Sequence, residues 1–295
     1  MKRIFLFLLT NILMMVTLSI VTTVVFSFCG ASMEAFFGEY AHLVVFAFVY
    51  GLGASVISLL ISKPMAKFST GAKRIDGSEG PAERWLVDTV ADLARRANLK
   101  TPEVAIYPGA PNAFATGAFR NSALVAVSDQ IMGQMTKEEL RAVLGHEMSH
   151  VANGDMVTLC LIQGVLNAFV ILFSRVLAQV LSSAGKDRNS RRGNGLYYVL
   201  VPVLDTVLGL LSSIVVFWFS RKREFAADAG SANLLGTPNS MIAALRRLGN
   251  LKPGVLPDSL KAMGIAGKRG TSIWSTHPSL EDRIEALNRW GSGAV

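Results

Sequence analysis

Charged residues are scarce in this 295-residue chain, at 17% of the total, while 51% of its residues are hydrophobic. Soluble domains usually contain about a quarter charged residues, so the deficit indicates that lipid solvates part of the chain. The formal net charge is +8, but the basic residues do not form one stripe interleaved with aromatic side chains, and a nucleic-acid partner is therefore not expected. They gather at the ends of apolar runs instead, as they do in membrane proteins.

Cysteine is also rare. Cys29 and Cys160 lie in or beside apolar runs, and neither has a second cysteine or a histidine at the spacing of metal ligands. A disulfide framework and a cysteine-ligated zinc site are therefore not expected. Both residues are interpreted as small packing or lipid-facing side chains.

Four apolar runs are long enough to cross a bilayer core of about 30 Å, which takes about 20 helical residues. They comprise Ile4 to Phe28, Ala41 to Ile61, Met156 to Leu181 and Leu196 to Phe219. The first run is too long for the apolar region of a signal peptide, and no A-x-A cleavage site follows it. We therefore expect it to be a retained membrane anchor.

Polar side chains interrupt the third and fourth runs, namely Gln163, Asn167, Arg175 and Asp205. Polar groups at membrane depth normally face other helices, a partner or water. They could line a substrate path. The simpler interpretation is that these groups form hydrogen bonds between helices, or that the Arg175 side chain reaches the membrane–water interface.

Residues 63 to 155, between the second and third runs, have the pattern of a soluble segment. Apolar residues recur at helical spacing over Ala82 to Asn98. Val104 to Tyr107 and Leu124 to Val127 are short β-prone runs bounded by turn residues, which predicts two strands. Pro108 to Asn121, between them, is expected to be a loop.

A helix that begins after Thr136 carries the main motif. Thr136 and Glu139 have the spacing of a capping box, which marks a helix start. The helix then contains H-E-x-x-H, with His146 and His150 on the same face because they are four residues apart. Two imidazoles so placed can each bind Zn²⁺ at about 2.0–2.1 Å. Glu147, rotated by about 100° from His146, can hold a water molecule beside the metal instead of binding it.

A catalytic zinc ion takes three protein ligands and keeps one position open for water. The candidate third ligand is Glu224, in a helix predicted over Arg221 to Leu235, with Asp228 on the same face to hold a ligand imidazole through its free N–H. E-x-x-x-D alone is a weak pattern, and an exposed acid pair is the alternative. The position of the E-x-x-x-D pattern favours a metal site, because it and H-E-x-x-H lie at the two ends of the same predicted membrane hairpin and are therefore held near each other.

The expected fold is a mainly α membrane protein with an α+β zincin-like metalloprotease domain. Residues 1–62 form an anchor with two transmembrane helices, 63–155 the first part of the protease domain, 156–220 a transmembrane hairpin and 221–295 the second part. Within that second part, helices are predicted over Asn239 to Leu248 and Pro278 to Trp290, with a long loop over 250 to 276.

Three stretches, HEMSHVANGD, SRKREFAAD and THPSLEDRI, resemble those of the HtpX membrane metalloproteases, which are relatives of the CAAX prenyl endopeptidases within the gluzincin group. The resemblance runs over nearly the whole chain. It implies one Zn²⁺ per chain, bound by His146, His150 and Glu224, with Glu147 as the catalytic residue. It also implies quality control of membrane proteins from the bacterial inner membrane, with the active site facing the cytoplasm and unfolded or membrane-protein polypeptides as substrates.

Three further residues are weaker candidates. The CAAX enzymes resemble this chain in a late histidine and arginine near the metal, here His277 and Arg283, and a donor there would stabilise the oxyanion. Alternatively, His277 caps the helix that starts at Pro278, while Arg283 pairs with nearby acids. Asn112 is a candidate for binding the substrate backbone, because in zincins an edge strand beside the metal pairs with an extended peptide.

Two other functions compete with this interpretation. In site-2-type intramembrane proteases the H-E-x-x-H motif lies within an apolar helix, whereas here polar residues precede and follow it. A non-catalytic membrane scaffold with structural zinc would need a fourth protein ligand, and only His277 offers itself.

Overall fold

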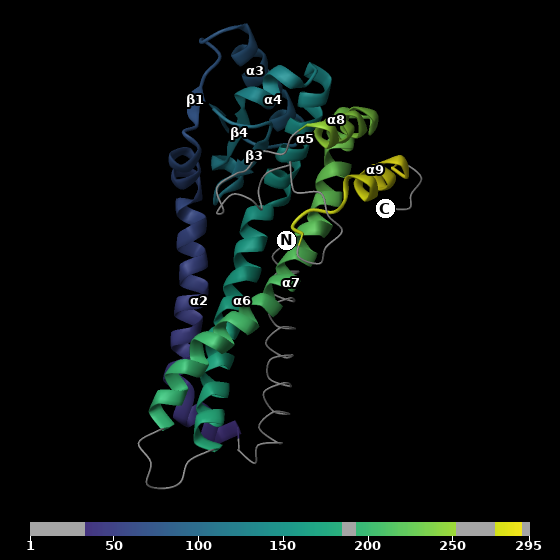
Figure 1. Cartoon of the computed structure of the whole chain (residues 1–295). Coiled ribbons are helices and arrows are strands. Elements are labelled where there is room, and N and C mark those ends of the chain that lie inside the picture. The colour runs from purple at the N-terminus through teal and green to yellow at the C-terminus, as the bar shows by residue number, and fades with distance from the viewer. Residues whose placement is uncertain (1–32, 185–192, 252–274, 291–295) are drawn as a thin grey trace. The chain divides into compact units, whose positions relative to one another are not determined.

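The computed structural model describes residues 33–184, 193–251 and 275–290, which belong to two compact units. Of these described residues, the first unit takes in those from 33 to 54 and those between 164 and 208, and the second takes in 55–163 and those from 209 onward. Three long helices contribute to both units: α2 (Met33–Thr70), α6 (Asp155–Ala184) and α7 (Gly193–Leu235) (Figure 1). Each of them contains a stretch long and apolar enough to cross a membrane. The predicted first span, Ile4 to Phe28, lies outside the described residues.

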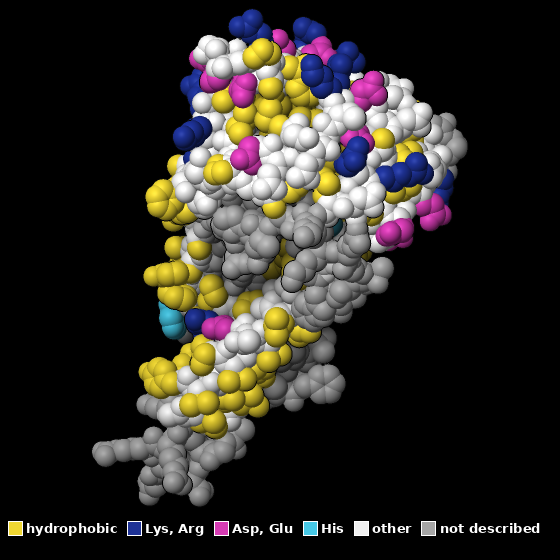
Figure 2. Space-filling model, turned by 45° about the horizontal axis from the view of Figure 1, so that its top comes forward, with side chains coloured by type: hydrophobic (Ala, Val, Ile, Leu, Met, Phe, Trp, Pro, Cys, Tyr) yellow, Lys and Arg dark blue, Asp and Glu magenta, His cyan; other side chains and the backbone are white. Residues whose placement is uncertain are grey.

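The surface of the first unit is apolar. Large side chains such as Val45, Val49 and Val199 are more than 60% exposed, and Figure 2 shows hydrophobic side chains along these helices. Contiguous exposed apolar surface of this kind marks contact with a partner or a membrane, and the helices that carry it are long and apolar enough to cross one. Close packing joins α2 to α6 at Gly51, where a Cβ atom would lie 2.4 Å from the Ala168 nitrogen.

Two charged residues of the first unit, Arg175 and Asp205, contact each other. Asp205 on α7 accepts a hydrogen bond from Ser174 on α6 at 2.5 Å and lies 3.4 Å from the Arg175 guanidinium. Arg175 also donates to the Ile171 carbonyl at 3.0 Å. Hydrogen bonding between helices, the simpler interpretation of the polar residues in these runs, is therefore confirmed for Arg175 and Asp205.

The second unit is built on a four-stranded sheet of order β1-β2-β4-β3. Its strands are β1 (Lys73–Ile75), β2 (Glu103–Tyr107), β3 (Ala113–Thr116) and β4 (Leu124–Ser128). β2 and β4 pair in parallel, and β3 pairs with β4 antiparallel as an edge strand. The predicted loop over 108–121 is thus wrong at β3. All four β3 residues are buried, so the strand lacks the alternation of polar and apolar residues that would have revealed it.

Helices cover one face of this sheet. α3 (Pro81–Arg96) and α5 (Lys137–Asn153) place Leu86, Val90 and Val143 against Val125 and Val127. Each such side chain contributes about 1.5–3 kcal/mol when it is fully buried. The short α4 (Asp129–Gln134) precedes α5, and α8 (Asn239–Asn250) and α9 (Leu280–Asn288) extend the same core. Phe114 and Leu124, on the other face, pack with Ala66 of α2.

The ends of α5 are fixed by local chemistry. The Thr136 hydroxyl accepts a hydrogen bond from the Glu139 amide at 3.2 Å, and the Glu139 carboxylate accepts one from the Thr136 amide at 2.9 Å. This is the predicted capping box. At the other end Gly154 adopts a left-handed conformation with φ of 69°, and α6 begins at the next residue. The mainly α fold class with an α+β domain is confirmed.

Candidate metal centre

Two helices of the second unit bring the predicted ligands together. α5 carries His146, Glu147 and His150, and the part of α7 beyond its apolar stretch carries Glu224. All four side chains are buried, and the ligand atoms of His146, His150 and Glu224 lie within 4.8 Å of one another. Among the residues that the structure describes, this is a group that could hold a metal ion.

The spacing of these atoms matches a tetrahedral centre. The Nε2 atoms of His146 and His150 are 3.1 Å apart, and the Glu224 carboxylate lies 3.6 Å from the first and 3.4 Å from the second. Ligand atoms around Zn²⁺ at bond lengths of about 2.0–2.1 Å are about 3.3–3.4 Å apart. Two imidazoles and a carboxylate are also a donor set that catalytic zinc uses.

The hydrogen bonds behind the imidazoles orient both Nε2 atoms toward the metal position. His146 Nδ1 lies 2.9 Å from Asp228 Oδ1, and His150 Nδ1 lies 2.6 Å from Asp155 Oδ2. Because an ionised carboxylate can only accept, each Nδ1 carries a proton and each neutral ring keeps its lone pair on Nε2. Two lone pairs 3.1 Å apart require a positive species between them. That species is a proton or a metal ion, so the residues fit a bound cation.

The pKa values of the two histidines shift in opposite directions, because burial and the neighbouring carboxylates act on them to different extents. Burial lowers the pKa of His146 despite its bond to Asp228. Burial acts the same way on His150, but Asp155 and Glu224 outweigh it and raise its pKa to about 10. Without a metal ion, the pair therefore holds one proton in addition to the two on the Nδ1 atoms, and His150 carries it. Glu224 stays ionised because His277, His150 and Arg283 hold its pKa well below its usual range against the effect of burial.

Glu147 has the environment of a proton acceptor. Its side chain is 1% exposed, and neither carboxylate oxygen has a hydrogen-bond partner of ordinary geometry among the described residues. Burial, reinforced by the neighbouring Glu224, raises its pKa to about 8, while His150 and the backbone of Ala115 act in the opposite direction. A carboxyl group with a pKa near neutrality can both take up and return a proton.

Arg283 and His277 contact the acids of the site. Arg283 donates from Nε and Nη2 to Asp228 at 2.7 and 2.6 Å, and its Nη1 lies 3.3 Å from Glu224 Oε2. Pairing with these acids was the alternative to a catalytic role for Arg283. His277 Nδ1 lies 2.9 Å from Glu224 Oε2. His277 does not cap the following helix, because α9 begins at Leu280 and the Ser279 hydroxyl caps it.

Asn112 directly precedes the edge strand β3. It is 1% exposed, its amide donates to the Ser128 hydroxyl at 3.0 Å, and its Oδ1 accepts from the Ala113 amide at 2.9 Å. Its predicted contact with substrate stays a prediction. The edge strand itself packs against α5, the helix that bears the motif.

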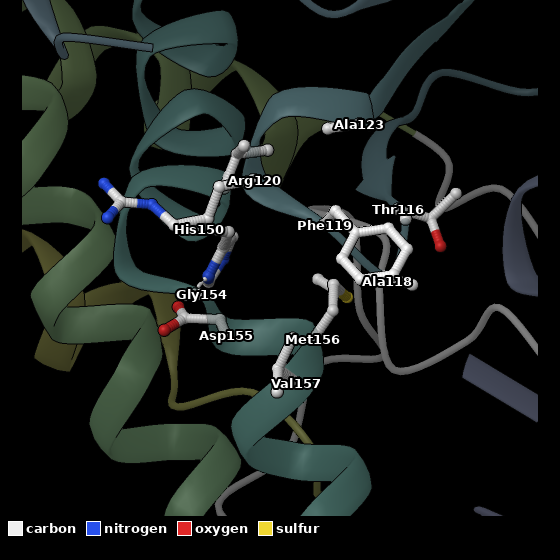
Figure 3. Close-up of a pocket in the computed structure, with 12 residues that line it drawn as sticks. Thr116, Ala118, Phe119, Arg120, Ala123, His150, Gly154, Asp155, Met156 and Val157 are labelled. Carbon is white, nitrogen blue, oxygen red and sulfur yellow. Dashed lines mark hydrogen bonds and ion pairs between the residues drawn. The ribbon is translucent and has the colours of Figure 1, made fainter. Parts of the chain in front are cut away.

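A pocket adjoins the metal centre on the side of His150. Its walls are residues 116–120 with Ala123, after β3, and 150–151 with 154–157, where α5 passes into α6. Figure 3 shows His150 and Asp155 on one side of this space and the ring of Phe119 on the other. Phe119 is 65% exposed.

Sequence reasoning overlooked Asp155 and Arg223. Asp155 bonds to His150 and forms an ion pair with Arg223, the residue before Glu224. Asp155 was visible only as the end of a polar N-G-D tripeptide, and Arg223 as one of three adjacent basic residues. A glycine that ends the motif helix, followed at once by an acid, was the available signal.

Comparisons with known proteins agree with this geometry. Residues 81–291 match peptidase family M48. A "Protease HtpX homolog" of Verminephrobacter eiseniae is 53% identical over 295 residues, covering 97% of this chain and 98% of that protein. One from Bordetella pertussis is 54% identical, with coverage of 97% and 98%. The crystal structure of S. mikatae Ste24p has the same fold, with a TM-score of 0.60 and 16% identity. The match covers 94% of this chain and 66% of that one.

Proposed function

The chain belongs to peptidase family M48 and is an HtpX-type membrane metalloprotease, and from this we propose that it holds one Zn²⁺ ion on His146, His150 and Glu224. We further propose that it hydrolyses peptide bonds of misfolded or damaged membrane proteins, with Glu147 as general base. The relatives named as HtpX homologues support the protease class. The geometry of the three ligands supports the metal.

One observation carries the proposal. Two buried imidazoles, each fixed by a carboxylate behind it, point their Nε2 atoms at each other across 3.1 Å with a third carboxylate beside them. A structural zinc site would be closed by a fourth ligand, whereas here the buried Glu147 carboxylate lies next to the three ligands, and neither of its oxygens has a hydrogen-bond partner of ordinary geometry among the described residues. An open metal position beside a proton acceptor is the arrangement of a hydrolase.

The protein's own residues supply the proton transfers. When bound, zinc lowers the pKa of water and polarises the scissile carbonyl. Glu147 takes the proton of the attacking water on its carboxylate and returns it to the nitrogen of the leaving amine. Burial raises the pKa of Glu147 to about 8, which suits both transfers.

His277 is our proposed donor to the oxyanion, since it is buried with its Nδ1 2.9 Å from Glu224 Oε2, and its Nε2 has no hydrogen-bond partner among the described residues. Arg283 directs three of its nitrogens at Asp228 and Glu224. We therefore propose that it acts mainly by holding these acids in place. Its catalytic role remains a prediction.

Extended, unfolded segments are the substrates that this site suits. β3 is the edge strand of the described sheet and packs against the motif helix, and main-chain pairing at a sheet edge tolerates many sequences. The membrane helix α6 begins only five residues after His150, so the site opens near the bilayer. Asn112, directly before β3, is proposed to help place the peptide backbone.

We also propose that the protein is a multi-pass protein of the bacterial inner membrane with the site in the cytoplasm. Nine basic residues flank the catalytic side of the predicted spans, against four in the predicted outer loop around residues 186–192. This excess of basic residues sets the orientation of the protein in the membrane. The four in the outer loop act against it, because positive charge prefers the cytoplasmic side.

Metal content and peptide hydrolysis, measured together, test the proposed function. Purified protein in detergent should contain one zinc ion per chain and degrade casein. Glu147→Gln should retain the zinc and lose the hydrolysis, because it removes the base and keeps the ligands. Glu224→Ala should lower both together. A Glu147→Gln variant that still degrades casein would refute the base, and stoichiometric zinc without hydrolysis in the natural protein would favour the scaffold function.

A further inference from the structure

Asp155 and Arg223 form a buried ion pair behind the metal centre. Asp155 is the first residue of α6, and Arg223 lies on α7. The side chains are 8% and 12% exposed, and an Arg223 guanidinium nitrogen contacts Asp155 Oδ1. The other oxygen of Asp155 lies 2.6 Å from His150 Nδ1. Both carboxylate oxygens of Asp155 are thus engaged, and neither is left to bind a metal ion.

Local backbone geometry puts Asp155 behind His150. In a continuous helix a residue five positions later would be rotated by about 140° from His150 and would face away from it. Gly154 breaks the helix with its left-handed φ of 69°, and its amide bonds back to the Val151 carbonyl at 3.1 Å. The chain then restarts as α6 with the Asp155 carboxylate directed at the imidazole (Figure 3).

We propose that Asp155 is a positioning residue for the metal ligand His150, and that Arg223 holds Asp155 in place. Arg223 directly precedes the ligand Glu224, so the pair ties the ligand on α5 to the ligand on α7. Both helices that supply the pair also contain the apolar stretches of the hairpin. The affinity for zinc therefore depends on how α6 and α7 meet at this point. The inference rests on the proposed function, because it needs zinc at His146, His150 and Glu224.

The test separates the effect on the metal from the effect on folding. Zinc affinity is measured by competition with a chromophoric chelator, and stability by thermal unfolding of the metal-free protein. Asp155→Asn should bind zinc about 10–100-fold more weakly, as expected when the carboxylate behind a ligand histidine is lost. It should also unfold at a lower temperature, because the buried Arg223 loses its partner.

The double variant Asp155→Asn/Arg223→Met shows whether weaker zinc binding comes from the lost carboxylate behind His150 or from lower folding stability. Removing the unpaired cation should return the unfolding temperature toward that of the natural protein, while zinc affinity stays low. Recovery of zinc affinity together with stability would overturn the proposal, and so would an Asp155→Asn affinity within about twofold of the natural protein's.

Asp92→Asn is the matched control. Asp92 on α3 bonds to Arg141 on α5 at 2.7 Å and likewise joins two helices, but it contacts no metal ligand. Its loss should leave zinc affinity unchanged. If the natural protein itself binds no zinc, the proposed function fails. If it binds zinc and Asp155→Asn binds equally well, only the positioning role fails.

Discussion

Arg283→Met should destabilise the protein strongly. Arg283 is 1% exposed, and it donates two hydrogen bonds to Asp228 while a third nitrogen lies 3.3 Å from Glu224. Methionine fills similar space but leaves both carboxylates without this cation. Breaking a buried ion pair by removing one partner costs about 3–5 kcal/mol. Two charge-assisted hydrogen bonds at about 1.5–3 kcal/mol each give a similar magnitude.

Thermal unfolding in detergent, at one heating rate and with a metal chelator present, measures this cost. A shift of roughly 2–4 °C per kcal/mol applies to domains of about 150–250 residues, so Arg283→Met should lower Tm by roughly 6–20 °C. The matched control is Arg289→Met at the end of the same helix, where the Arg289 side chain is 59% exposed and pairs with Glu285. Exposed pairs contribute about 0.2–1 kcal/mol, so this change should be small.

The double variant Asp228→Asn/Arg283→Met provides a second measurement, because it also removes the Asp228 charge that Arg283→Met leaves unpaired. It should melt above Arg283→Met alone. A Tm for Arg283→Met within about 2 °C of that of Arg289→Met would refute the reasoning. If such a variant also kept its zinc but lost turnover, Arg283 would instead act on the reacting carbonyl.

Three further predictions concern the site and the membrane. Asp228→Asn should weaken zinc binding about 10–100-fold in a chelator competition, because Asp228 holds His146 at 2.9 Å; unchanged affinity would reduce it to a partner of Arg283. His277→Ala should lower kcat with little change in zinc affinity, since a donor to the oxyanion acts mainly in the transition state; loss of zinc instead would make His277 a ligand. In a chain without its native cysteines, Arg188→Cys should react with an impermeant maleimide in intact cells while Ser78→Cys is protected; protection at both positions would show that the α6–α7 hairpin does not cross the membrane.

The helices that carry the chemistry could be predicted because their signals are local. The capping box at Thr136 and Glu139 fixes where α5 begins, and spacing within the helix then puts His146 and His150 on one face. Glu224 was found from a weak pattern strengthened by its place after the hairpin. α7 proved to be one continuous helix from Gly193 to Leu235, because nothing at the end of its apolar stretch breaks it.

The sheet was only half predictable. β1 has three residues and pairs with β2, while β3 reads AFAT and is buried throughout. Neither has the length or the alternation that identifies a strand in sequence, and both depend on β2 and β4 for their hydrogen bonds. The contact of Asp155 with His150 was equally hidden. It depends on a left-handed Gly154, and helical spacing alone would have placed the two side chains apart.

The buried charges explain why the second unit contains segments from both sides of the predicted hairpin. His146 takes its carboxylate partner from α7, Asp228 takes its cation from α9, and His150 takes its partner from the first residue of α6. Buried charges are tolerated only when they are paired, so none of these segments can provide a stable site without the others. A chain that ends before Glu224 has two imidazoles and no third ligand, and its zinc affinity should fall accordingly. Since metal binding contributes to folding free energy, the metal centre can stabilise the second unit only after the chain has returned through α7.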